Sequence, residues 1–289
     1  MPKNNIGADL LVCPGFATFG AGAPHTGLPL HLAALKIIPI AHNTFRESAR
    51  DRVLYNLVLF VVLLVIASVV MGRIAVGQEV KIIIDVGLSA MTIFGVLIAI
   101  FLGIGLVSKE IENDAIANIL SKPVRRSEFI LGKYFGLLIT LLASVAAMSA
   151  AITLALLYAK GADAKLRIWP AVWLIFLELA IITVIALLFS CFSSPALSAM
   201  FTLLIFLIGR WSPDLKLFAE TSGSTGARVV SRALYHLLPN LANFNYINET
   251  AHGQTAPWQM VAGNTVYAVF YIAAALAAAV LIFNRRNLK

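Results

Sequence analysis

Long apolar stretches separated by short polar segments dominate the sequence of this 289-residue chain. A bilayer core about 30 Å thick requires about 20 mainly apolar residues in helical form, so each long stretch predicts a membrane-spanning helix. Only Ser193 and Ser194 separate the fourth stretch from the fifth, which predicts a tight helical hairpin with Pro195 in the first turn of the second helix. The six predicted spans are residues 53–71, 82–107, 130–158, 169–192, 195–211 and 261–283. The expected fold is therefore an all-α integral membrane protein with six transmembrane helices.

The composition excludes an ordinary soluble enzyme and a disordered chain. Hydrophobic residues make up 60% of the sequence and charged residues 12%, whereas soluble proteins average about 45–50% and about 25%. Two cysteines are too few for a disulfide framework, and no CxxC pair offers a zinc site. The net charge of +8 would indicate nucleic acid in a soluble protein. In a membrane protein it is typical of loops beside anionic lipid, so we expect membrane lipid and no nucleic acid as partners.

Basic residues are distributed unevenly between the two sides that the spans define. An even number of spans places both termini on one side, and that side collects more of the lysine and arginine residues. Loops rich in lysine and arginine tend to remain in the cytoplasm. We therefore expect cytoplasmic N and C termini and an extracytoplasmic loop over residues 212–260. Within this loop, residues 230–238 predict an interfacial or re-entrant helix that Pro239 ends. Residues 1–30 are expected to form a flexible tail ahead of one transmembrane domain over residues 31–289.

The polar segment between the second and third spans predicts a charged amphipathic helix. Residues 108–136 read SKEIENDAIANILSKPVRRSEFILGKYFG. Apolar residues recur at three- to four-residue spacing from Val107 to Leu120 and share one helical face, while charged and amide residues occupy the other. Pro123 ends this helix. The segment therefore predicts a short cytoplasmic helix with its acidic side open to a partner, and the alternative is a charged connector lying on the membrane surface.

The part of this segment that reads ENDAIANILSKPVRRSEFILGKYFG resembles the cytoplasmic segment of ABC-2 type transporter permeases. In that family an acidic amphipathic helix leads into a Leu-Ser-Lys-Pro stretch, an Arg-Ser pair and a Gly-Lys-x-x-Gly, which correspond to residues 120–123, 126–127 and 132–136 here. Residues 40–60, IAHNTFRESARDRVLYNLVLF, are similar to the interfacial helix that precedes the family's first span. The resemblance therefore rests on the order of several motifs and on the number of spans.

The resemblance implies a permease subunit that exports a substrate with ATP hydrolysed by a separate nucleotide-binding subunit. The cytoplasmic helix would act as a coupling helix, docking in that subunit and transmitting its closure to the membrane helices. A second permease copy, identical or different, would complete a dimer in a bacterial inner membrane. The implied contacts with the ATPase are Lys109, Glu110, Glu112, Asn113, Asp114, Asn118, Ser121 and Lys122, together with Phe45, Arg46, Glu47 and Arg50 on the interfacial helix.

Motifs for ATP hydrolysis or other catalysis do not occur in the sequence. It contains no GxxxxGK[ST], GxSxG or HExxH, and its five histidines are scattered singly. We therefore expect no enzymatic activity, no metal and no cofactor on this chain, with ATP and Mg²⁺ bound by the partner ATPase. Two alternatives stay open, namely a secondary transporter or channel that needs no ATPase, and a membrane scaffold that anchors an enzyme or an assembly.

Glu178 lies near the middle of the fourth predicted span. An ionisable group at that depth costs roughly 2.5–3.5 kcal/mol unless it faces a partner or water. It is either a pathway or ion-coupling residue, or a carboxyl that is protonated or hydrogen-bonded to a neighbouring serine or threonine and holds helices together. Asp85, near the end of the second span, is the other carboxyl that the sequence offers as a relay partner.

Small residues mark closely packed helix faces in the third span. Gly132 and Gly136 open this span, and Ala143, Ala147 and Ala151 follow at intervals of four residues. Such spacing is typical of a face on which a neighbouring helix approaches closely. The neighbour belongs either to the same chain or to a second copy of it.

Overall fold

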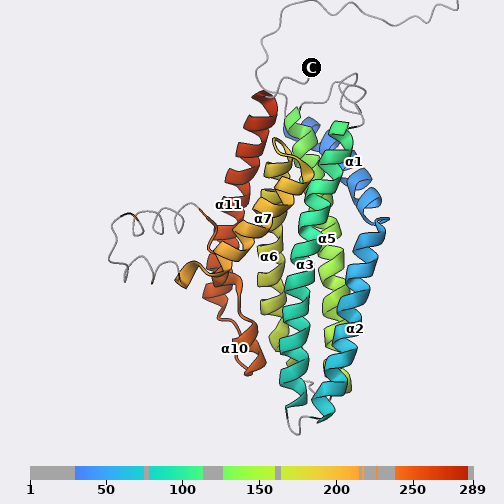
Figure 1. The fold of residues 1–289 in the computed structure, drawn as a ribbon, viewed down its shortest axis with the longest axis vertical. Coiled ribbons are helices and arrows are strands. Elements are labelled where there is room, and N and C mark those ends of the chain that lie inside the picture. Colours follow the sequence, from blue (N-terminus) through green and yellow to red (C-terminus); the bar gives the residue numbers. More distant parts are fainter. Residues whose placement is uncertain are drawn as a thin grey trace, which may run out of the picture.

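The computed structural model describes residues 30–74, 78–112, 126–159, 164–214, 217, 226 and 238–285. These residues contain helices and no strand, so the all-α prediction is confirmed for this part of the chain. The helices are α1 (Leu30–Ser48), α2 (Arg52–Ile74), α3 (Glu79–Glu112), α5 (Arg126–Tyr158), α6 (Ala164–Ser190), α7 (Pro195–Arg210), the 3₁₀ helix η1 (Leu241–Phe244), α10 (Ile247–Ala251) and α11 (Trp258–Arg285) (Figure 1).

Five helices of the described residues are long and apolar enough to cross a membrane, and they correspond to five of the six predicted spans: Leu54–Ile74, Glu79–Gly105, Ser127–Tyr158, Leu166–Ser190 and Trp258–Ile282. The structure differs from the prediction at the remaining span, residues 195–211. This span forms α7, which has only 16 residues. At 1.5 Å per residue it reaches about 24 Å, less than the hydrocarbon core of about 30 Å. The chain therefore has a shorter apolar helix where we expected a sixth full span.

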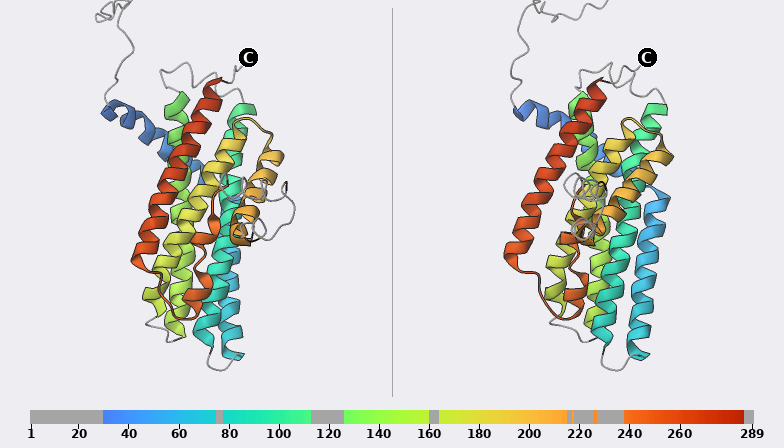
Figure 2. Two further views of the ribbon diagram at one scale, coloured as in Figure 1. Left: turned by 90° about the vertical axis from the view of Figure 1, so that its left-hand side faces the viewer. Right: turned by 60° about the vertical axis from the view of Figure 1, so that its left-hand side comes forward.

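Helix α6 is at the centre of the bundle, with α3, α5, α7 and α11 around it (Figures 1 and 2). Its sequence is apolar on all sides, as expected for a helix enclosed by other helices. Two glycines bring α3 close to it. A Cβ atom at Gly95 would lie 2.6 Å from Cδ1 of Leu179, and one at Gly103 would lie 2.8 Å from Cβ of Ala186. Side chains at these positions would force α3 away from α6.

Residues 238–257, the described stretch before α11, contain the short helices η1 and α10 and no long helix. The end of α7 contacts the start of this segment, because a Cβ atom at Gly209 would lie 2.7 Å from the carbonyl oxygen of Pro239. Helix α10 lies at the end of the bundle where α3 begins, and Nζ of Lys81 is 3.0 Å from Nε2 of His252 there. Helix α11 then runs back, and it ends at the same end of the bundle as α1 (Figure 1). Helix α7 and this segment together thus occupy the place of the sixth span.

Helix α1 packs obliquely across the first turns of α5 (Figure 2). Gly132 and Gly136 make this contact possible, since a Cβ atom at Gly136 would lie 2.6 Å from the carbonyl oxygen of Ala41 and 2.6 Å from Cβ of Thr44. The close neighbour of this glycine pair is therefore a helix of the same chain. Ala143 and Ala147, further along α5, are exposed.

Candidate functional site

The residues of α1 that the family resemblance singled out lie at one end of the bundle. Phe45 is half-buried, and Arg46 and Glu47 are exposed. Arg50 is exposed in the turn after α1, where its backbone N–H donates to the carbonyl oxygen of Glu47 at 3.2 Å. Helix α1 packs on Gly132 and on the next turn of α5. The helix that carries these side chains is therefore held against the start of α5.

The last residues of α3 lie at the same end of the bundle (Figure 1). Helix α3 has 34 residues and ends at Glu112. It is about 51 Å long, so it exceeds the hydrocarbon core by about 20 Å. Lys109, Glu110 and Glu112 belong to its last turn, which makes the start of the predicted coupling helix a direct continuation of the second span. The other predicted contacts, Asn113, Asp114, Asn118, Ser121 and Lys122, lie outside the described residues.

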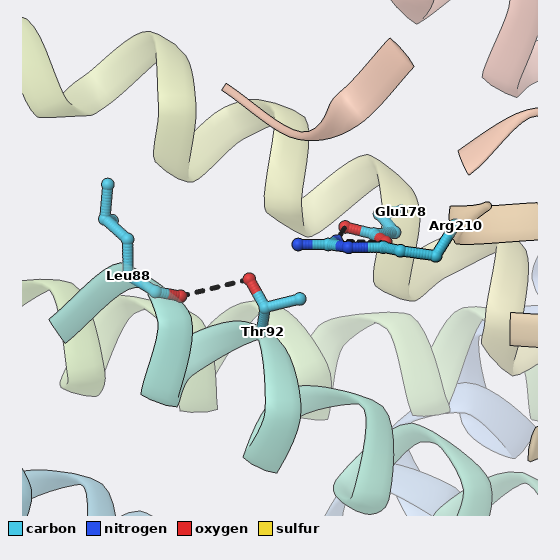
Figure 3. Close-up of polar contacts among 4 residues, drawn as sticks. All are labelled: Leu88, Thr92, Glu178 and Arg210. Carbon is cyan, nitrogen blue, oxygen red and sulfur yellow. Dashed lines mark hydrogen bonds and ion pairs between the residues drawn. The ribbon is translucent and has the colours of Figure 1, made fainter. Parts of the chain in front are cut away.

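An ion pair connects α6 and α7 inside the bundle. Nη1 of Arg210 lies 2.8 Å from Oε1 and 3.1 Å from Oε2 of Glu178 (Figure 3). The Glu178 side chain is 0% exposed and that of Arg210 is 23% exposed. The Arg210 guanidinium also lies 5.9 Å from the ring centre of Phe206, one turn earlier on α7. The buried carboxylate therefore has a charged partner that still reaches accessible space.

The pairing corrects our interpretation of Glu178. From the sequence, Glu178 is either a pathway or ion-coupling residue, with Asp85 as a relay partner, or a carboxyl that is protonated or hydrogen-bonded to a serine or threonine and holds helices together. The neighbouring hydroxyl of Thr92 instead donates to the carbonyl oxygen of Leu88 on its own helix, at 3.0 Å (Figure 3). Glu178 is bound by an arginine because α7 is short and ends beside the middle of α6.

The pairing of Glu178 with Arg210 could have been predicted from the geometry of the hairpin that α6 and α7 form. Glu178 lies about 18 Å before the end of α6, and Arg210 lies about 22 Å after the start of α7. Helices α6 and α7 are antiparallel neighbours joined by a tight turn, so the two residues reach a similar depth. An opposite charge at matching depth is the natural partner for an intramembrane carboxylate.

Polar contacts connect Ser212, which closely follows Arg210 in the chain, with η1 and α11. The Ser212 hydroxyl donates to Oδ1 of Asn240 at 2.5 Å, and the backbone N–H of Asn240 donates to the hydroxyl of Tyr267 on α11 at 3.0 Å. The side-chain amide of Asn264 donates to the carbonyl oxygen of Asn243 at 2.8 Å. The end of α7, η1 and α11 are thus linked by hydrogen bonds. In the described part of the chain, no three histidine, cysteine, aspartate or glutamate residues lie together as a metal site would require.

Comparison with known proteins places the chain in a family. No curated protein matches its sequence. The sequence profile of the family described as ABC-2 family transporter protein matches residues 38–288. This match includes both segments whose motifs resemble ABC-2 permeases, the five described helices that are long enough to span a membrane, and the ion pair. The match extends over most of the sequence, and the chain, a multi-pass membrane protein, belongs to the ABC-2 transporter family.

Proposed function

We propose that this chain is the membrane-spanning permease subunit of an ATP-binding cassette exporter, and that a separate subunit binds and hydrolyses ATP with Mg²⁺. On this proposal the chain itself catalyses no reaction and carries no cofactor. The observation that supports it best is the extension of α3 beyond the length of a membrane, at the end of the bundle where α1 rests on α5. In a member of this family, these are the surfaces that a nucleotide-binding subunit would contact.

Helix α3 offers a direct route from that contact into the membrane. It continues without interruption from Glu79 to Glu112, so a displacement of its last turn moves its membrane-spanning part as well. Gly95 and Gly103 hold α3 against α6 along that part. Helix α6 in turn carries Glu178, which binds α7 through Arg210. Closure of the ATPase would therefore act, through α3 and the central helix α6, on the short helix α7.

Helix α1 would provide the second contact with the ATPase. Arg46 and Glu47 are exposed on it, and its other face is packed on Gly132 and Gly136. Movement of α1 would therefore move the start of α5. The proposed assembly contains two permease copies, identical or different, and two ATPase subunits. It lies in a bacterial inner membrane with α1 and the C-terminus on the cytoplasmic side.

Purification of the tagged full-length chain from its native membrane tests the partner first. We expect a protein with a P-loop ATPase motif to be retained, as identified by mass spectrometry. If the membranes yield the chain without any such protein, the proposed assembly is wrong. Transport by proteoliposomes that contain this chain alone would instead support a secondary transporter or channel. The buried Glu178–Arg210 pair is the feature that keeps this alternative open.

Charge reversal at the end of α3 tests the coupling route. We expect the triple variant Glu110→Lys, Glu112→Lys and Asp114→Lys to abolish stimulation of the partner's ATP hydrolysis by the permease. A matched control, Glu79→Lys, reverses a charge at the opposite end of the same helix and should leave that stimulation within about twofold. Unchanged co-purification and unchanged turnover in the triple variant would show that this segment does not couple the two subunits.

A further inference from the structure

An apolar groove runs between α2 and α5 on the outer surface of the bundle. Its volume is about 570 Å³, within the range of roughly 300–1,000 Å³ that is typical of sites for small molecules. Ala151 and Ala155 form part of its floor, and their small side chains leave the space open. Valine, isoleucine, leucine and alanine residues line the groove, and only its end is polar: Val62, Val65, Ile66, Val69, Val70, Arg73, Ala151, Leu154, Ala155 and Tyr158.

The length of the groove matches one leaflet of a bilayer. Along α2 it extends from Val62, in the middle of the helix, to Arg73 in the last turn. This distance is about 16 Å at 1.5 Å per residue, and half of a hydrocarbon core of about 30 Å is about 15 Å. The polar end of the groove therefore lies at the membrane surface opposite α1, which is the outer leaflet under the predicted topology.

A preorganised cation occupies this polar end. The Cζ atom of Arg73 is 5.0 Å from the ring centre of Tyr158, and Nη2 of Arg73 donates a hydrogen bond to the Tyr158 hydroxyl. Both side chains are exposed, and no carboxylate of the described residues pairs with Arg73. The aromatic ring orients the guanidinium while its remaining N–H donors stay available. A planar guanidinium matches the geometry of a phosphate group, which accepts two parallel hydrogen bonds from it.

We propose that this groove binds an anionic phospholipid, with one acyl chain between α2 and α5 and the phosphate on Arg73. An acyl chain fills an apolar groove of leaflet length, whereas a soluble phosphate would leave it empty. A net negative headgroup complements Arg73 better than a zwitterionic one, in which a second, cationic group repels the guanidinium. The lipid would join α2 to α5 through its chain, independently of which substrate the protein transports.

Lipid titration of the purified full-length chain, followed by native mass spectrometry, tests this site. We expect phosphatidylglycerol to bind about tenfold more tightly than phosphatidylcholine: both lipids offer Arg73 a phosphate, but the choline cation repels the guanidinium, and repulsion between two exposed charges a few ångströms apart is worth about that factor. Arg73→Gln should remove the preference, and Arg73→Lys should retain part of it. Lys81→Gln, at the same membrane surface, is the matched control and should retain the full preference. Equal binding of the two lipids by the unchanged protein would overturn the proposal.

Larger side chains inside the groove test whether it holds an acyl chain. Ala151→Leu, or Ala151→Phe, should weaken both lipids at this site by about tenfold while helical content stays unchanged by circular dichroism. Glycerol 3-phosphate, which has the headgroup chemistry without chains, should not displace phosphatidylglycerol. Displacement by glycerol 3-phosphate, or undiminished binding in both Ala151 variants, would show that Arg73 binds the phosphate alone and that the groove holds no chain.

Discussion

Removal of Arg210 should destabilise this protein more than removal of its partner. In Arg210→Met the side-chain volume is largely kept, but the carboxylate of Glu178 loses both hydrogen bonds from Nη1, at 2.8 and 3.1 Å. The Glu178 side chain is 0% exposed, so water cannot replace them. In Glu178→Gln the guanidinium of Arg210 loses its charged partner instead. The Arg210 side chain is 23% exposed, so water can partly solvate it. The two single variants therefore differ in how deeply the unpaired charge is buried.

The expected magnitudes follow from that difference. Breaking a buried ion pair by removing one partner costs about 3–5 kcal/mol, and we expect Arg210→Met to fall in this range. Glu178→Gln keeps a hydrogen-bond acceptor beside a partly accessible guanidinium, so we expect about 1–3 kcal/mol. The double variant Glu178→Leu/Arg210→Met leaves no charge behind. It should be less destabilised than Arg210→Met, because well-packed apolar residues often replace a buried pair at little net cost.

Unfolding of the full-length chain in mixed detergent micelles, followed by circular dichroism, measures these free energies. Thr92→Val is the matched control at the same place in the bundle, since its hydroxyl donates only to the carbonyl of Leu88 (Figure 3). We expect this variant to lose about 1 kcal/mol or less. The reasoning is refuted if Arg210→Met costs no more than Thr92→Val, or if the double variant is as unstable as the sum of its two single variants.

Two further predictions concern glycines at close helix contacts. Gly136→Leu places a Cβ atom 2.6 Å from the Ala41 carbonyl oxygen, so it should destabilise the chain by about 1–3 kcal/mol and increase proteolysis of α1. Gly209→Val places a Cβ atom 2.7 Å from the Pro239 carbonyl oxygen, so it should destabilise to a similar extent and speed hydrogen exchange in η1 and α10. Gly263→Ala is the control for both, because beyond its chain neighbours and the adjacent backbone of α11 its Cβ meets no described atom within 4 Å, and it should gain about 0.5–1 kcal/mol from helix propensity. If Gly136→Leu or Gly209→Val is as stable as Gly263→Ala, the close contact at that glycine is contradicted.

Five of the spans could be predicted from the sequence because length and apolar composition alone identify them. The bounds of α2, α5 and α6 lie within a few residues of the predicted ones. The sixth predicted span is not confirmed, and the reason is physical. The residues of α7 are as apolar as those of a full span, and only the length of 16 residues distinguishes this helix from one that crosses the hydrocarbon core. Composition alone does not make that distinction.

The candidate site was predictable only in part, since the relevant information lies in contacts between helices. Glu178 was identified from its type and depth, but its partner depends on the pairing of α6 with α7. The glycine motif at residues 132–136 indicated a close contact without indicating the helix that makes it, and the structure identifies that helix as α1. A local sequence pattern indicates that a residue requires a charged partner or a close neighbour, whereas the packing of the helices determines which residue that is.

We expect the contact between the end of α7 and η1 to change first when α6 moves relative to α7. Irregular backbone inside a membrane is tolerated only where protein or water satisfies its polar groups. Leu241 and Phe244 of η1 are 0% exposed, and α6, α7 and α11 provide that cover. A shift of α6 relative to α7 would separate Glu178 from Arg210 and uncover η1 at the same time. Helix α3 packs along α6 and, like α5, is longer than the membrane is thick. A force applied to the last turn of α3 would therefore act through α6 on the contact between α7 and η1.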